Sequence, residues 1–197
     1  MILPGFTTHY LFGVKSYNDL PNNYLKHVIS KYRGLYQIGL QGPDIFFFFG
    51  AHTDNPVVRF GEHLHNVSAA PFFANALGVI RQKGRMSREY AYLCGFVCHF
   101  ILDSECHPYV EKMIRETGVQ HLEIEEEFEK LLLKEDGKDP IGFPVATRVP
   151  TDRATAQALQ PFYPVKPQRF QNGGRREYIP LGIIRQSLFS MKWIKSL

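Results

Sequence analysis

The stretch that decides the fold is Tyr90-Ala-Tyr-Leu-Cys-Gly-Phe-Val-Cys-His99-Phe-Ile-Leu-Asp103-Ser-Glu-Cys-His107-Pro108. Its continuous apolar pattern has no proline before Pro108 and predicts a buried helix. His99 and Asp103 are four residues apart, so their side chains leave the same face of this helix one turn apart. His107 follows after another four residues. A proline disfavours the helical conformation of the residue before it, so we expect the helix to end at His107.

A second histidine–carboxylate pair lies in the next predicted helix, where His121 and Glu125 are again four residues apart. One such pair on a helix is more often a surface ion pair than a metal site. However, Asp103 follows so apolar a segment that an unpaired carboxylate there would be costly. Imidazole and carboxylate together suit zinc, and a catalytic zinc needs three such ligands and an open position. The two pairs, with His107 between them, therefore favour a metal cluster.

The remainder of that second helix is expected to be structural. Its glutamates from Glu123 to Glu129, apart from Glu125, are interpreted as a solvated face. Its apolar stripe is expected to consist of Leu122, Phe128, Leu131 and Leu132.

The N-terminal half supplies further candidates, His9, Asp44 and an H-x-H pair of His63 and His65. Asp44 follows the turn signal Gly42-Pro43. Taken alone it is best interpreted as a helix N-cap, because aspartate is a preferred capping residue. In a helix, only one of two histidines spaced by two residues faces a given cluster.

Composition bounds the class of protein. The 197 residues are 44% hydrophobic and 21% charged, which predicts one globular domain and excludes wholesale disorder. The net charge of +4 suits an anionic substrate but is too weak to indicate nucleic acid by itself. We identify no signal peptide, and the most apolar run, residues 45–49, is far shorter than a membrane span, so a cytoplasmic location is expected.

The pattern predicts an all-α fold, a single multi-helix domain in three parts. Residues 1–135 form the helical metal-binding part, with helices expected at 18–38, 44–50, 57–82, 86–106, 108–117 and 119–135. Residues 136–180 are rich in proline and glycine and are expected to form a loop or lid. Residues 181–197 are expected to form a terminal helix that packs on the same domain through an apolar stripe. Peripheral membrane contact through this helix is the alternative.

Several segments resemble the zinc-dependent phospholipase C family, also called the phospholipase C/D domain. The resemblance runs from residue 7 to about residue 130. Its specific core is the H-x-x-x-D-x-x-x-H-P-Y pattern of residues 99–109. The other matching segments are Thr8-His9-Tyr10, Gly39-Leu-Gln-Gly-Pro-Asp44-Ile-Phe-Phe, His65 and His121-Leu-Glu-Ile-Glu125.

The resemblance implies an all-helical fold, similar to that of single-strand-specific fungal nucleases, with up to three zinc ions. By motif, one zinc is held by Asp44, His65, His99 and Asp103, a second by His107, His121 and Glu125, and the third by His9 with Asp103 bridging. His65 is chosen over His63 because the polar Asn66 follows it. Secreted members complete the third site with their N-terminal amine. Met1 lies eight residues before His9, so participation of its amine, and with it a third zinc ion, is left open. Two zinc ions are expected.

The leading hypothesis is thus a zinc-dependent phosphodiesterase of the phospholipase C type. In it a metal-activated water attacks phosphorus, and Asp44 serves as ligand, general base or both. The substrate, phospholipid or nucleotide, does not follow from the residues. One alternative is a zinc-dependent nuclease or nucleotidase. Another is a non-catalytic, metal-binding helical protein that binds a partner.

Overall fold

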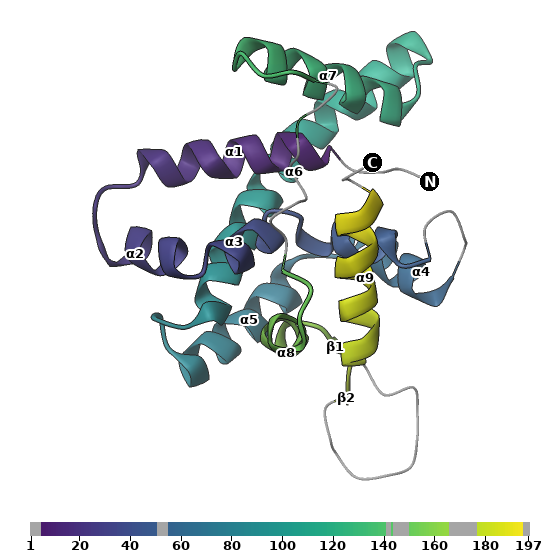
Figure 1. Ribbon diagram of the computed structural model, residues 1–197. Coiled ribbons are helices and arrows are strands. Elements are labelled where there is room, and N and C mark those ends of the chain that lie inside the picture. Colours follow the sequence, from purple (N-terminus) through teal and green to yellow (C-terminus); the bar gives the residue numbers. More distant parts are fainter. Residues whose placement is uncertain (1–4, 51–54, 141–142, 144–149, 166–176, 195–197) are drawn as a thin grey trace.

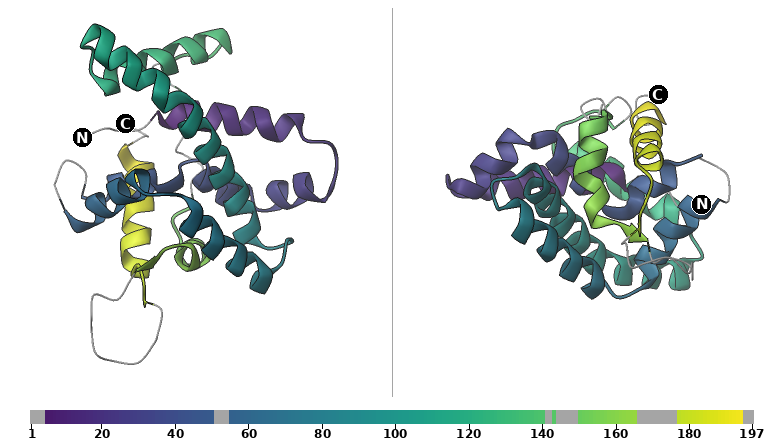
Figure 2. Two further views of the ribbon diagram at one scale, coloured as in Figure 1. Left: turned by 180° about the vertical axis from the view of Figure 1, so that it is seen from behind. Right: turned by 90° about the horizontal axis from the view of Figure 1, so that it is seen from below.

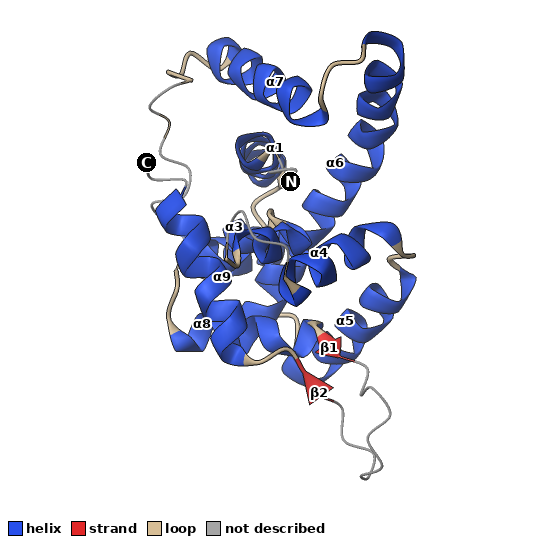
Figure 3. Cartoon of the chain, turned by 90° about the vertical axis from the view of Figure 1, so that its right-hand side faces the viewer, coloured by secondary structure: helices blue, strands red, loops and turns tan. Residues whose placement is uncertain are grey.

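The computed structural model describes residues 5–50, 55–140, 143, 150–165 and 177–194 of the chain (Figure 1). The fold is all-α, as predicted, apart from an antiparallel ladder of two residues from each of β1 (Pro164–Val165) and β2 (Glu177–Tyr178) (Figure 3). No helix of the described residues is long and apolar enough to cross a membrane. The helical elements are α1 (Phe6–Asp19), α2 (Tyr24–Lys31), α3 (Arg33–Gly39), η1 (Gly42–Phe48), α4 (Pro56–Asn66), α5 (Ala70–Lys83), α6 (Arg88–Thr117), α7 (His121–Glu135), α8 (Arg153–Leu159), η3 (Gln160–Phe162) and α9 (Leu181–Ile194).

The central element is α6, which runs diagonally across the whole molecule when seen from behind (Figure 2). The Ser87 side chain caps its start, and Gly118, in the left-handed region, ends it. The expected end at His107 is wrong, because the helix continues through Pro108. Pro108 removes one backbone donor, and the regular turns on both sides of it outweigh that local cost.

The helices α3 and α6 cross at backbone contact. A β-carbon on Gly39 would lie 2.2 Å from the carbonyl oxygen of Tyr92, and one on Gly95 would lie 2.1 Å from that of Tyr36. Only glycine fits both positions. The contact fixes the part of α6 that carries His99 against the part of the chain that leads into η1.

Several element boundaries differ from the expected ones. α1 was not expected at all, and residues 18–38 divide into α2, which the Asn23 side chain caps, and α3. Residues 57–82 divide into α4 and α5. The proline-rich segment 136–180 contains α8, which begins where the Asp152 side chain accepts a hydrogen bond from the backbone N–H of Thr155.

The core lies between η1, α6 and the C-terminal elements. The rings of Phe46 and Tyr163 pack edge to face with centroids 4.9 Å apart, and Phe162 packs on Tyr92 at the same distance. On α9, Ile184 and Leu188 are fully buried, and the helix contacts η1. Membrane contact through α9 stays a prediction.

Candidate metal centre

The eight candidate side chains come from five elements. α1 carries His9, η1 carries Asp44, α4 carries His65, α6 carries His99, Asp103 and His107, and α7 carries His121 and Glu125. They form three groups, in each of which one donor atom per residue lies within 4.8 Å of the others: Asp44, His65 and His99; His9, His99 and Asp103; His107, His121 and Glu125.

The first group is built around Asp44, which is buried in the first turn of η1. Its Oδ1 lies 2.8 Å from His65 Nε2, and its Oδ2 lies 3.9 Å from His99 Nδ1. The other ring nitrogen of His65, Nδ1, lies 2.8 Å from the carbonyl oxygen of Gly61. That hydrogen bond fixes the ring with Nε2 facing Asp44. The N-cap interpretation of Asp44 is wrong, since Gln41 occupies that position.

The ring of His99 is held by backbone on its far side. Gly42 has a φ of +50°, and a β-carbon there would lie 2.1 Å from Cδ2 of His99. The backbone of Leu40 also faces the His99 ring, while Nδ1 of that ring has no hydrogen-bond partner among the described residues. Nδ1 is thus left to face Asp44.

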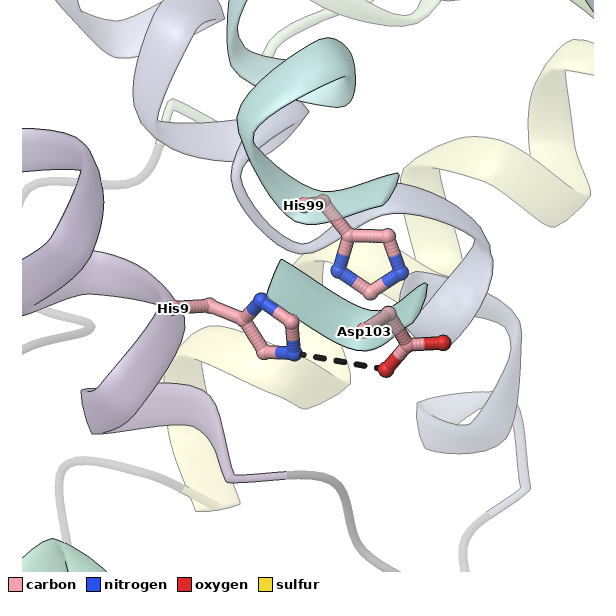
Figure 4. A group of neighbouring side chains, drawn as sticks. All are labelled: His9, His99 and Asp103. Carbon is pink, nitrogen blue, oxygen red and sulfur yellow. Dashed lines mark ion pairs between the residues drawn. The ribbon is translucent and has the colours of Figure 1, made fainter. Parts of the chain in front are cut away.

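The second group joins α1 to α6 (Figure 4). The rings of His9 and His99 have centroids 4.3 Å apart. His9 Nε2 lies 3.8 Å from Asp103 Oδ1, and the same oxygen lies 3.0 Å from His107 Nε2. Asp103 thus connects the buried histidines with the third group.

The third group lies where α7 meets the end of α6. His121 Nε2 lies 2.7 Å from Glu125 Oε1, and the rings of His107 and His121 have centroids 5.3 Å apart. The side chains of His107, His121 and Glu125 are 38%, 15% and 19% exposed, so water reaches this group more readily than the other two.

The pKa values follow this difference in burial. Burial lowers the pKa of His9 to about 4 and that of His99 well below its usual range, which keeps both imidazoles neutral. Burial also raises the pKa of Asp44 to about 6, against the opposing hydrogen bond and charge of His65. For Asp103, burial is outweighed by the hydrogen bond from His107 and the histidine charges, and its pKa falls to about 2.

The histidines that face these carboxylates shift the other way. Burial lowers the pKa of His65, but its hydrogen bond with Asp44 and the charge of Asp44 prevail and raise it to about 9. The hydrogen bond with Asp103 raises the pKa of His107.

Four buried atoms indicate that a cation fits the centre. His9 Nδ1, Asp44 Oδ2, His99 Nδ1 and Glu125 Oε2 have no hydrogen-bond partner among the described residues. Leaving buried polar atoms unpaired is costly, and a cation between Asp44 Oδ2 and His99 Nδ1, which lie 3.9 Å apart, would remove that cost for this pair. Neutral imidazole nitrogens and carboxylate oxygens are ligands that zinc accepts. The residues present therefore fit the metal that the sequence analysis predicted.

The groups differ in two respects from the sets that the resemblance implied. Asp103 lies with His9, as the third set implied, but it is not grouped with Asp44 and His65, and His99 joins both groups. Of the H-x-H pair, the structure brings His65 to Asp44, whereas His63 belongs to none of the three groups. Met1 lies outside the described residues, so a role for its amine stays open.

Sequence reasoning missed a contact made by Glu129, which was interpreted as part of a solvated face. Its Oε1 accepts a hydrogen bond from the backbone N–H of Thr7 at 2.6 Å. The spacing of four residues from Glu125 is the one signal that could have identified it. The expected stripe of α7 is also wrong at Phe128 and Leu131, which are 44% and 51% exposed.

Comparison with known proteins gives one match. Neither the search of curated proteins nor the search of solved structures finds a match. The family model described as zinc dependent phospholipase C matches residues 8–169, which include all eight donor residues. The match covers most of the chain and confirms the resemblance that the histidine pattern carried. The chain belongs to the zinc-dependent phospholipase C family.

Proposed function

We propose that the chain hydrolyses phosphodiesters at this centre, with zinc held by the three groups of donor residues. The observation that carries the proposal is the pair of buried atoms Asp44 Oδ2 and His99 Nδ1, which lie 3.9 Å apart and have no hydrogen-bond partner among the described residues. Bound zinc supplies a Lewis acid for the phosphate oxygens and lowers the pKa of water. Histidine and carboxylate ligands are typical of catalytic zinc sites.

Asp44 is the group we assign to proton transfer. A carboxylate has two oxygens, so the Asp44 oxygen that does not hold zinc would take the proton of the attacking water. The water oxygen forms a bond to phosphorus, and the bond from phosphorus to the leaving oxygen breaks as that oxygen takes up the proton that Asp44 accepted. Because the pKa of Asp44 is raised to about 6, its carboxylate is ionised at neutral pH and is a stronger base than an exposed aspartate.

Two neutral histidines would hold the ions without adding positive charge. His9 and His99 are buried, and their lowered pKa values keep their lone pairs free at neutral pH. The family description supports a phospholipid as substrate. The net charge of +4 is compatible with any anionic phosphodiester, so nucleotides are the alternative that the experiment must separate.

The test compares two neighbouring histidines on α4. Zinc-loaded wild type, His65→Ala and His63→Ala are assayed with phosphatidylcholine in mixed micelles, with single-stranded DNA and with bis(4-nitrophenyl) phosphate. We expect the wild type to release diacylglycerol and a phosphorylated head group. His65→Ala should lower that rate by at least about 100-fold, since changes around zinc ligands already cost 10- to 100-fold. His63→Ala is the matched control and should retain the rate.

Three results would change the conclusion. Cleavage of DNA without cleavage of phospholipid would replace the lipase proposal with a nuclease. Stoichiometric zinc without hydrolysis of any of the three substrates would leave a non-catalytic metal-binding protein. Equal loss in the two variants would remove His65 from the centre.

A further inference from the structure

We infer that Glu129 is a positioning residue for the metal centre, because it holds α7 against the N-terminus of α1 and so sets the third donor group relative to His9. The inference rests on the proposed function, since its object is the placement of zinc ligands. It concerns a residue outside the three donor groups.

The contact joins segments that are far apart in the sequence. Glu129 Oε1 accepts from the backbone N–H of Thr7 at 2.6 Å and lies 3.4 Å from that of Thr8, across 122 and 121 residues. The first N–H groups of a helix have no partner within the helix, and a negative charge there is favoured by the helix dipole. The N-cap of α1 is Gly5, which has no side chain, and the first turn of α1 contains no acidic residue. Glu129 therefore supplies the cap that α1 lacks.

The same contact lies next to donors on both helices. On α7, His121, Glu125 and Glu129 follow one another at intervals of four residues, so they share one face. On α1, His9 comes two residues after Thr7. Viewed nearly along α1, α7 passes across it (Figure 3), and the two helices are in contact. A shift of Glu129 on Thr7 would thus move the third group relative to the second.

Apolar packing does not supply a contact of this kind for α7. Among the α7 side chains that the structure describes, Leu133 is buried, Ile124 and Leu132 are half-buried, and Phe128 and Leu131 are largely exposed. Apolar burial is non-directional, so these side chains favour docking of the helix but do not define its rotation as a hydrogen bond does. A charge-assisted hydrogen bond to backbone N–H groups has a defined direction. The orientation of the His121–Glu125 face therefore depends on Glu129.

Zinc binding by the metal-free protein tests the inference without an activity assay. Wild type, Glu129→Leu and Glu129→Gln are titrated with zinc in competition with a chromophoric chelator. Glu129→Leu removes the acceptor, and we expect zinc at the groups containing His9 and His121 to bind about 10- to 100-fold more weakly. The group of Asp44, His65 and His99 should keep its wild-type affinity. Glu129→Gln retains an acceptor oxygen and should recover most of the loss.

Two controls separate positioning from plain loss of stability. Glu127→Gln changes an exposed glutamate of α7 and should bind zinc as the wild type does. Leu133→Ala leaves a cavity and lowers the melting temperature of the metal-free protein, but it should leave zinc affinity unchanged where the protein is folded. Wild-type zinc affinity in Glu129→Leu would overturn the inference about Glu129 but not the proposed function. So would weakening of every site in proportion to melting temperature in both Glu129→Leu and Leu133→Ala. A wild-type chain that binds no zinc would overturn the proposed function as well.

Discussion

The two ends of the donor cluster are built differently. At the inner end, His9, Asp44 and His99 are buried, and backbone at Gly42 and Leu40 surrounds the His99 ring. At the outer end, the side chains of His107, His121 and Glu125 are partly exposed. The inner donors are positioned by the core whether or not metal is present. Two of the outer donors, His121 and Glu125, depend on α7, which lies across the end of α6 (Figure 1).

The strongest way to break this comparison is to change Asp103, whose Oδ1 faces both His9 and His107. Asp103→Asn keeps the shape of the side chain and removes the charge that both histidines face. We expect phosphodiester hydrolysis to fall by at least about 100-fold together with the zinc content. Glu105→Gln, at an exposed position two residues further along α6, is the control. Full zinc content and full activity in Asp103→Asn would remove Asp103 from the centre.

A second experiment measures each end separately through zinc content. His99 belongs to both inner groups and His121 to the outer group alone. In protein purified without added metal, His99→Ala should lose the zinc of the two groups that contain His99. His121→Ala should lose only the zinc of the group that contains His121. Elemental analysis measures the difference, and His27→Ala, at an exposed histidine of α2, is the control. Equal losses in the two variants would mean that the ends do not bind metal separately.

The smallest effect is on the pH dependence of stability in the metal-free protein. The pKa of His9 is about 4 when folded and 6.5 as its ordinary value. The unfolded chain therefore binds the proton more tightly, and stability falls as the pH drops from about 6.5 to about 4. This difference in the pKa of His9 corresponds to roughly 3 kcal/mol in the free energy of unfolding. Urea unfolding of wild type and His9→Gln across this range measures it.

His107 should show the opposite sign, because its folded pKa is raised. The contribution of His107 to the free energy of unfolding is fully present below its pKa in the unfolded chain. It is lost as the pH rises through its pKa in the folded protein. Comparison of wild type with His107→Gln tests this. If the contributions of His9 and His107 to the free energy of unfolding changed with pH in the same direction, the contrast between the buried and the half-exposed end of the donor cluster would be contradicted.

The sequence identifies the candidate donors that the structure groups together better than it predicts the helices that hold them. Spacings of four residues identify His99 with Asp103 and His121 with Glu125 because both partners lie on one helix. Asp44 and His65 come from different elements, and only the family resemblance pointed to their partnership. Which residues share a zinc could not be derived, since the position of Asp103 beside His9 depends on how α1 crosses α6.

The errors in the helices have physical causes of the same kind. α1 has no capping side chain of its own, because its cap comes from Glu129. Local rules also place a helix end at His107, and the flanking turns override them. By contrast, the Asp152 cap of α8 is a local signal, and it was overlooked within a segment interpreted from its prolines.

The backbone contact between α3 and α6 has a consequence for how substitutions in this chain should be judged. Gly39 stands five residues before Asp44, and Gly95 stands one turn before His99. A methyl group on either glycine would meet a carbonyl oxygen and drive the two helix axes apart. Asp44 and His99 would separate with them, although neither had been altered. Natural variants that retain all eight donors can therefore still lack a working centre, and screening them requires attention to these two glycines as well as to the ligands.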